Sequence, residues 1–168
     1  MHEYRITKYD PKNRNELGCY MVNEWTSFWD IGKSFTGEVF NYHEYINVEN
    51  KYIHAIELLM KRQCLGSLRT RNLGKYGIPF DMTTTKDMIK LYNELNCDCN
   101  ICIQIMPTFC RLILRDYVGA QLVSPNMFVH FGYEYYMYIG VTTGCIEELR
   151  EIEASGLFVE ECESPYGR

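Results

Sequence analysis

A stretch of thirteen residues, 128–140 (FVHFGYEYYMYIG), most constrains what this chain can fold into. It holds six phenylalanine or tyrosine residues and one histidine. Before and after Gly132, every second residue belongs to the same set, so that two sets would point to opposite faces of a strand. Alternation with a period of two in aromatic and β-branched residues predicts strands. Gly132 can take the positive φ that a tight connection requires. We therefore expect a β-hairpin at the centre of the domain. Its second strand would place Tyr135, Met137, Ile139 and Val141 on one face and Glu134, Tyr136 and Tyr138 on the other.

The two faces of this hairpin predict different surroundings. The first face is apolar and should pack on helices. The second carries tyrosines, which can either cover a half-buried sheet or stack on the bases of single-stranded nucleic acid. The sequence places no basic cluster beside residues 128–140, which favours the packing interpretation.

Three segments have the periodicity of amphipathic helices. The clearest covers residues 41–62, where Asn41 and Glu44 fit a capping box and an apolar stripe follows at steps of three and four. Residues 84–95 predict a second helix and residues 145–155 a third. Gly156 follows the third, in the position that favours a helix-ending glycine.

Strand patterns fill most of the remaining chain. The sequence predicts a single α+β domain over residues 1–168, with a mainly antiparallel sheet and three to four helices packed on it. Residues 101–115 are ambiguous, because Ile101, Ile103 and Ile105 alternate as in a strand while Pro107 opens a helical pattern. The other strands are expected at residues 3–9, 65–73, 116–123 and 157–161.

Residues 18–40 read as irregular and contain both tryptophans. A long loop in a compact domain is usually functional or held by the core. Trp25 and Trp29 can hold this loop by packing inward, which we favour, or can anchor a partner protein.

The net charge of −5 comes entirely from the C-terminal part of the chain, because residues 147–168 hold seven glutamates against two arginines. Residues 1–146 are therefore neutral overall. An acidic segment of this kind repels nucleic acid and attracts basic proteins, or simply forms a solvated helix face. The candidate partner-binding residues are Glu147, Glu148, Glu151, Glu160, Glu161 and Glu163.

The cysteines and the start of the chain indicate in which cellular compartment we expect the protein. The start, MHEYRITKYD, is polar and does not resemble a signal peptide, and no apolar run reaches membrane-spanning length. We therefore expect a cytoplasmic protein with reduced thiols. Cys97, Cys99, Cys102 and Cys110 can offer thiolates to zinc, but their spacing lacks two separated pairs of the CxxC type. We expect no metal and no cofactor.

Few residues point to catalysis. His130 is suited to acid–base chemistry near neutral pH, and a nuclease-like site would join it with Glu134, Arg111 or Arg115. A single histidine on a strand is more often packed or hydrogen-bonded. Arg111 and Arg115 lie four residues apart on one helical face, where they can hold a phosphate or carboxylate. We favour an exposed or internally paired couple, because most such pairs are structural. We expect no enzyme.

Four segments together resemble a known group of proteins. They are residues 23–27 (NEWTS) with 30–32 (DIG), 111–115 (RLILR), 128–140, and 156–159 (GLFV) with 164–166 (SPY). This set is similar to small bacterial cytoplasmic proteins, some of which resemble immunity proteins of contact-dependent growth inhibition systems. The resemblance covers most of the chain and assigns no site residues.

The resemblance implies a protein that binds and neutralises a toxin domain from a neighbouring cell. Many such toxins are basic nucleases, and the acidic C-terminal part suits a basic partner. We therefore expect an immunity protein that covers the functional surface of a cognate toxin. The alternatives are a single-stranded nucleic-acid-binding domain that uses the tyrosine face, and a small nuclease that uses His130.

Overall fold

One antiparallel sheet organises the structure, which is a computed structural model describing residues 1–79, 82–96 and 99–167. Its strand order is β5-β4-β6-β7-β8-β1-β9, so the predicted hairpin, formed by β7 and β8, lies at the centre. All of its strand pairs are antiparallel. The strands are β1 His2–Thr7, β4 Ser67–Lys75, β5 Asn100–Cys102, β6 Val118–Val123, β7 Met127–Phe131, β8 Met137–Val141 and β9 Phe158–Glu161.

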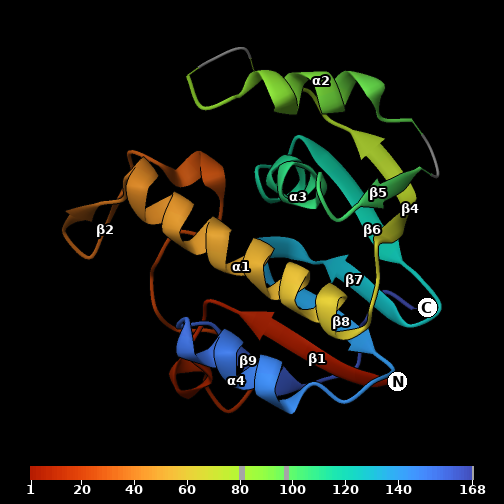
Figure 1. Ribbon diagram of the computed structural model, residues 1–168. Helices are drawn as coiled ribbons and strands as arrows, with labels where there is room; N and C mark the ends of the chain where they lie inside the picture. Colours follow the sequence, from red (N-terminus) through yellow and green to blue (C-terminus); the bar gives the residue numbers. More distant parts are fainter. Residues whose placement is uncertain (80–81, 97–98, 168) are drawn as a thin grey trace.

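Four α-helices cover one face of the sheet (Figure 1). Helix α1 lies across the strands and packs against α3 on one side and α4 on the other, while α2 packs against α3. This arrangement confirms the predicted single α+β domain with a mainly antiparallel sheet. The helices are α1 Tyr42–Arg62, α2 Lys86–Glu94, α3 Met106–Leu114 and α4 Ile146–Ala154.

The other face of the sheet carries a row of side chains in register across six strands. Residues that lie opposite each other in an antiparallel sheet point to the same side. The row starts on β4 and ends on β9, and it mixes cations, anions and rings. Its members are Arg71, Gln121, His130, Tyr138, Arg5 and Glu160.

Local signals place the helix ends. Asn41 caps α1, and its side chain accepts a hydrogen bond from the Glu44 amide (3.0 Å) while the Glu44 carboxylate accepts one from the Asn41 amide (3.1 Å). This reciprocal pair is the predicted capping box. Thr85 caps α2 in a similar way, through the Met88 amide. Gly156 follows α4 with a φ of +95°, as predicted for a helix-ending glycine.

The central hairpin packs as its alternation predicts, but the connection between β7 and β8 is not the predicted tight turn. Met137, Ile139 and Val141 are buried on the helix side of the sheet. Gly132 has a φ of −89° and therefore does not make the tight turn expected of it. The chain instead forms a longer connection through η3 Tyr133–Tyr135, and the positive φ values fall on Glu134 (+55°) and Tyr135 (+64°).

The ambiguous segment 101–115 contains both kinds of element. It begins with the last residues of β5, whose Ile101 pairs with Leu68, and continues into α3, where Pro107 occupies the first turn.

Residues 18–40 contain only short elements, as expected: η2 Phe28–Asp30 and the two-stranded sheet of β2 Ser34–Phe35 and β3 Glu38–Val39. None of the helices within the described ranges has the length and apolar character required to cross a bilayer.

Candidate functional site

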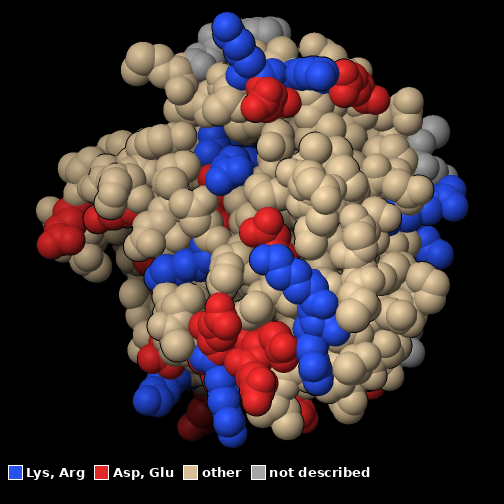
Figure 2. Space-filling view, in the orientation of Figure 1, with Lys and Arg blue, Asp and Glu red and all other residues tan. Residues whose placement is uncertain are grey.

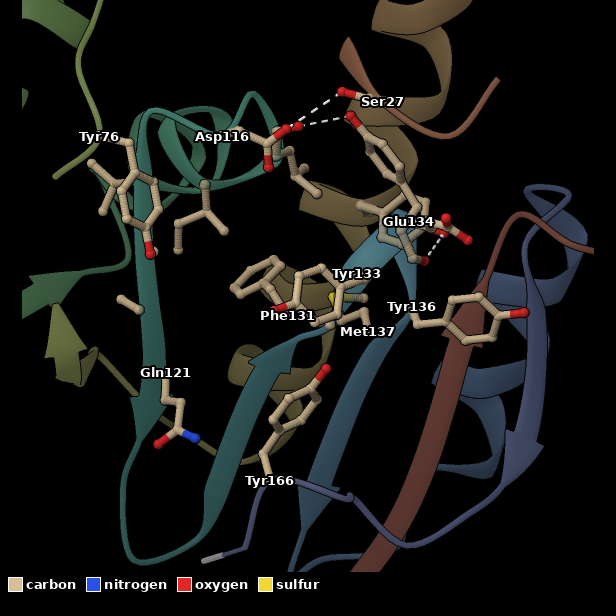
Figure 3. A pocket seen from close by; sticks show the side chains of 18 of the residues that line it. Ser27, Tyr76, Asp116, Gln121, Phe131, Tyr133, Glu134, Tyr136, Met137 and Tyr166 are labelled. Carbon is tan, nitrogen blue, oxygen red and sulfur yellow. Dashed lines mark hydrogen bonds between the residues drawn. The ribbon is translucent and has the colours of Figure 1, made fainter. Parts of the chain in front are cut away.

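A cleft of about 580 Å³ opens where β6 and β7 diverge (Figure 3). The two strands pair only over three positions, from Gln121 opposite His130 to Val123 opposite Phe128. The first half of β6 therefore separates from the end of β7 and leaves a gap in the sheet. A volume of this size falls in the ordinary range for ligand-binding pockets.

Seven aromatic residues line this cleft, which we call the aromatic cleft (Figure 3), and two of them, Tyr52 and Tyr135, are buried. The other five come from four segments: the chain after β4, the end of β7, the connection from β7 to β8, and the C-terminal segment. Two of the rings are largely exposed, with 87% of Tyr133 and 72% of Tyr76 accessible to solvent. The five are Tyr76, Phe131, Tyr133, Tyr136 and Tyr166.

Two glycines allow these rings to approach the backbone. A Cβ atom on Gly119 of β6 would lie 2.4 Å from the Tyr76 hydroxyl oxygen, so only glycine lets that ring lie against the strand. A Cβ atom on Gly132 would lie 2.9 Å from the Tyr166 hydroxyl oxygen and 2.9 Å from the carbonyl oxygen of Tyr136. Gly132 is therefore required for close packing at the cleft rather than for a turn.

The charged groups that line the cleft are both acidic. Asp116 lies just before β6 and Glu134 in the β7–β8 connection, and the described lining residues include no Lys, Arg or His. The Ser27 hydroxyl donates a weak hydrogen bond to Asp116 (3.4 Å), and none of the described residues forms an ion pair with it. Partial burial raises the pKa of the Asp116 carboxyl, and the Ser27 hydrogen bond offsets only part of that effect.

Backbone strain is concentrated around the same cleft. Six non-glycine residues in the described ranges have positive φ, and four of them line it. A left-handed conformation outside glycine costs free energy and persists where the surrounding structure requires it. Such strain is common at functional sites, so it marks this cleft among the surfaces of the protein. The four are Asn72, Asp116, Glu134 and Tyr135.

A buried layer of hydrogen bonds supports the cleft from beneath. The Tyr135 hydroxyl donates to the carbonyl oxygen of Leu114 (2.7 Å) and lies 3.0 Å from the Tyr45 hydroxyl. The Tyr52 hydroxyl donates to the carbonyl oxygen of Tyr135 (2.7 Å). These bonds tie the β7–β8 connection to α1 and α3, so the strained residues are held by the core of the domain.

The predicted contact residues on α4 are partly engaged within the protein. The Glu151 carboxylate lies 2.8 Å from His54 and the Glu148 carboxylate 3.7 Å from Arg62. Figure 2 shows acidic side chains gathered over this region with basic ones directly beside them. Glu147 is exposed and forms no ion pair within the described part of the chain.

Of the predicted contact residues on and after β9, one is paired within the protein and two are not. Glu160 receives charged hydrogen bonds from Arg14 (2.7 Å) and Arg5 (3.1 Å), and these lower the pKa of its carboxyl. Glu161 and Glu163 are exposed and have no ion pair in the ranges that the structure describes. Three of the six predicted glutamates, Glu147, Glu161 and Glu163, are thus free to meet a partner.

The tyrosine face of the hairpin is largely occupied by rings of the same chain. Tyr136 stacks on Tyr9 with ring centroids 5.3 Å apart, and the Arg5 guanidinium lies 5.7 Å from the Tyr136 ring. Tyr138 meets Tyr166 edge to face at 5.9 Å. Base stacking on the flat face of β8 would therefore require these contacts to open.

His130 lies beneath the C-terminal segment and is only 1% exposed. Its ring stacks on Phe128 at 4.4 Å, and its Nδ1 atom lies 2.7 Å from the Ser164 hydroxyl. The charged residues that act on it are Glu3 and Arg71. The structure does not bring His130 together with Glu134, Arg111 or Arg115, so the nuclease-like constellation is not assembled.

Acid should destabilise the protein through His130. Burial lowers the pKa of His130 below its ordinary value of 6.5, so the unfolded chain binds this proton more readily than the folded protein. This contribution to stability is complete above pH 6.5 and is lost as the pH falls from 6.5 through the folded pKa. We expect His130→Phe to lose less stability than the unmodified protein between about pH 7 and pH 5, measured by urea unfolding. An equal loss in both proteins would contradict this assignment, and the exposed His54→Gln serves as the control.

The arginine pair, Arg111 and Arg115, forms its contacts within the protein, which is one of the alternatives that the sequence left open. Arg115 is buried and donates two hydrogen bonds to the buried carboxylate of Glu49, at 2.7 and 2.8 Å. Arg111 lies 3.3 Å from the same carboxylate and donates to the Asn50 side chain. Both guanidinium groups are thus occupied by partners within the fold.

The cysteine cluster is only partly described, since Cys97 falls outside the described residues. Cys99 lies beside Thr70 (3.6 Å), while Cys110 is buried in α3. Among the described residues, no group of three or more His, Cys, Asp or Glu side chains is placed to hold a metal ion.

Comparisons with protein-family models, with curated proteins and with solved structures find no significant match. The function proposed below therefore rests on the geometry of this chain and on the resemblance described above.

Proposed function

We propose that this protein binds a basic protein partner and neutralises it, as an immunity protein does with a cognate toxin domain. The observation that carries the proposal is the aromatic cleft, which exposed tyrosine rings line together with two carboxylates that form no ion pair among the described residues. Tyrosine is enriched at the energetic centres of protein interfaces, because it buries a large ring and offers a hydroxyl. Exposed rings at a concave surface therefore support protein binding.

The chemistry of the cleft supports binding rather than group transfer. Its described lining residues are glycines and residues with aromatic, aliphatic, thioether, carboxylate, amide or hydroxyl side chains, with no His, Cys or Lys. The hydroxyl of Ser27 lies beside Asp116 at 3.4 Å, without an imidazole to activate it. Negative charge among aromatic rings favours a positively charged partner.

The free glutamates of the C-terminal part provide long-range attraction. Charged groups at an interface mainly accelerate encounter, and their effect decreases with salt. Glu147, Glu161 and Glu163 are exposed and unpaired within the described residues, so their charge reaches solvent. We assign to them the steering of a basic partner and to the aromatic cleft the tighter contact.

Affinity capture from a nuclease-treated extract of cells that encode the protein tests the proposal. We expect one stoichiometric basic protein, identified by mass spectrometry. The purified partner should associate about tenfold more slowly with the Glu147→Lys, Glu161→Lys, Glu163→Lys variant at low salt.

A matched control makes the same total change in charge at exposed sites elsewhere: Glu16→Lys, Glu38→Lys and Glu94→Lys. We expect this variant to keep an association rate close to that of the unmodified protein. Equal slowing in both variants would show that only net charge matters and would remove the three glutamates from the interface. Nucleic acid as the only retained species would favour the nucleic-acid-binding alternative.

A further inference from the structure

Building on the proposed function, we propose that the aromatic cleft receives an arginine side chain of the protein partner. Its guanidinium group would pair with Asp116 and lie against the tyrosine rings of the cleft wall. Three features of the fold support this contact: carboxylates at the cleft that form no ion pair among the described residues, exposed rings beside them, and two cation sites of the same kind elsewhere in the protein.

The charge at the cleft lacks a counterpart. Asp116 has only the hydroxyl of Ser27 beside it, and Glu134 adds a second carboxylate to the lining. Lys8 acts electrostatically on Glu134 from outside the cleft, but its ammonium forms an ion pair with Glu24 (2.5 Å). A partner cation would therefore find two acidic groups that form no ion pair with a described cation of this chain.

The protein already surrounds its own cations in the same way. The Lys8 ammonium lies 4.2 Å from the centroids of both the Tyr9 and Trp25 rings and pairs with Glu24. Tyr9 in turn stacks on Tyr136, one of the rings of the cleft. Rings together with a carboxylate thus form a cation site next to the aromatic cleft.

A second such site is formed at Arg115, which directly precedes Asp116 in the chain. The Arg115 guanidinium pairs with Glu49 and lies 5.3 Å from the Phe28 ring and 5.8 Å from the Tyr45 ring. The aromatic cleft also combines rings with a carboxylate, and its Tyr76, Tyr133 and Tyr166 are exposed to solvent. A site of this kind is suited to bind a guanidinium group.

Arginine suits the cleft better than lysine. A guanidinium is planar, stacks on ring faces, is weakly hydrated and offers a fork of donors to one carboxylate. The side chain of a partner protein also explains the exposed rings at the mouth, since a second macromolecule would cover Tyr133 and Tyr76 while a small molecule inside the cleft would leave them in water.

Titration with N-acetyl-arginine amide tests the cleft directly. The amide signals of Gly119 and Gly132, both of which line the cleft, report binding in a ¹⁵N-labelled sample. N-acetyl-citrulline amide has the same shape without the charge. We expect the arginine compound to shift both signals, and the citrulline compound to bind at least about tenfold more weakly.

Two variants assign the contact to residues. Asp116→Asn removes the charge and keeps a side chain that tolerates positive φ, and we expect it to weaken binding of the arginine compound about tenfold. Tyr133→Ala removes an exposed ring without disturbing the core and should also weaken it. Glu153→Gln, which removes one charge from an exposed position of α4, should bind as the unmodified protein does. Equal binding of the citrulline compound, or no shift at all, would overturn the inference.

Binding of the captured partner to the Asp116→Asn variant distinguishes a failure of this inference from a failure of the proposed function. Asp116→Asn should weaken its binding by about 30-fold or more, because a buried charge pair loses one member. If the partner binds this variant as tightly as the unmodified protein, the arginine contact is wrong while the proposed function stands. If no basic protein binds but the arginine compound does, the cleft recognises a small cation, and both the proposed function and the protein source of the guanidinium are wrong.

Discussion

Replacing Arg115 with methionine should lower the free energy of unfolding by about 3–5 kcal/mol. Both members of the pair are buried, with 2% of Arg115 and none of Glu49 exposed. Removing the guanidinium leaves a carboxylate in the core without the two hydrogen bonds that satisfy it. The carbonyl oxygen of Thr83 also loses the hydrogen bond from Arg115. Arg111, 3.3 Å from Glu49, compensates only in part because it lies at the surface.

The double variant Glu49→Leu, Arg115→Met is the control for this prediction. It removes both charges and fills the space with apolar groups, so we expect it to recover most of the lost stability. The single variant Glu49→Leu completes the thermodynamic cycle, and urea unfolding of the unmodified protein, the two single variants and the double variant measures the coupling. A double variant as unstable as Arg115→Met would show that the loss comes from packing and not from an isolated buried charge.

Replacing Trp25 with alanine should cost about 3 kcal/mol, because this residue joins the irregular N-terminal segment to the core. Its ring stacks on Phe40 with centroids 4.5 Å apart and meets Tyr135 edge to face at 5.1 Å. It also forms one wall around the Lys8 ammonium. Trp25→Ala therefore removes a large, partly buried ring that packs on the core, and leaves the Lys8 ammonium with one of its two aromatic neighbours.

Trp29, four residues later, provides a matched comparison. It is 55% exposed and contacts Phe28 and Tyr117 only by ring edges. We expect Trp29→Ala to cost less than about 1 kcal/mol. Thermal unfolding of the two variants measures the difference. A similar loss in both would contradict the packing assigned to Trp25, and a loss of partner binding in Trp29→Ala alone would place that ring at the interface.

Local rules were sufficient to predict most of the secondary structure. The side chains of Asn41 and Glu44 specify where α1 begins, because a capping box requires only four consecutive residues. The alternation after Gly132 correctly predicted which side of β8 faces the helices. Ile101 and Pro107 predicted a strand and a helix in turn, but no local rule locates the boundary between them.

The candidate site could not be predicted in the same way, because it depends on contacts between distant segments. The ion pairs of Glu160 reach back to Arg5 and Arg14 at the other end of the chain, so the sequence could not show that this carboxylate is engaged. The divergence of β6 from β7, which opens the aromatic cleft, is a property of the assembled sheet. Asp116 gave no sequence signal that distinguishes it from an ordinary loop aspartate.

The hairpin connection illustrates why a glycine is ambiguous. Gly132 resembled a turn residue, since its missing side chain permits positive φ. The structure uses the same property differently, to let the Tyr166 hydroxyl approach the backbone. The positive φ values fall on Glu134 and Tyr135, which buried hydrogen bonds from α1 hold in place. Strain and glycine together mark the aromatic cleft, but each becomes interpretable only in three dimensions.

Co-expression with the captured partner is the most direct test of the central claim, that this protein neutralises a basic protein. The partner domain, expressed alone in a sensitive host, should arrest growth, and co-expression of the unmodified protein should restore it. The Glu147→Lys, Glu161→Lys, Glu163→Lys variant should protect less at equal expression, whereas the matched control variant should protect fully. Growth that stays arrested although the two proteins form a stoichiometric complex would contradict the account.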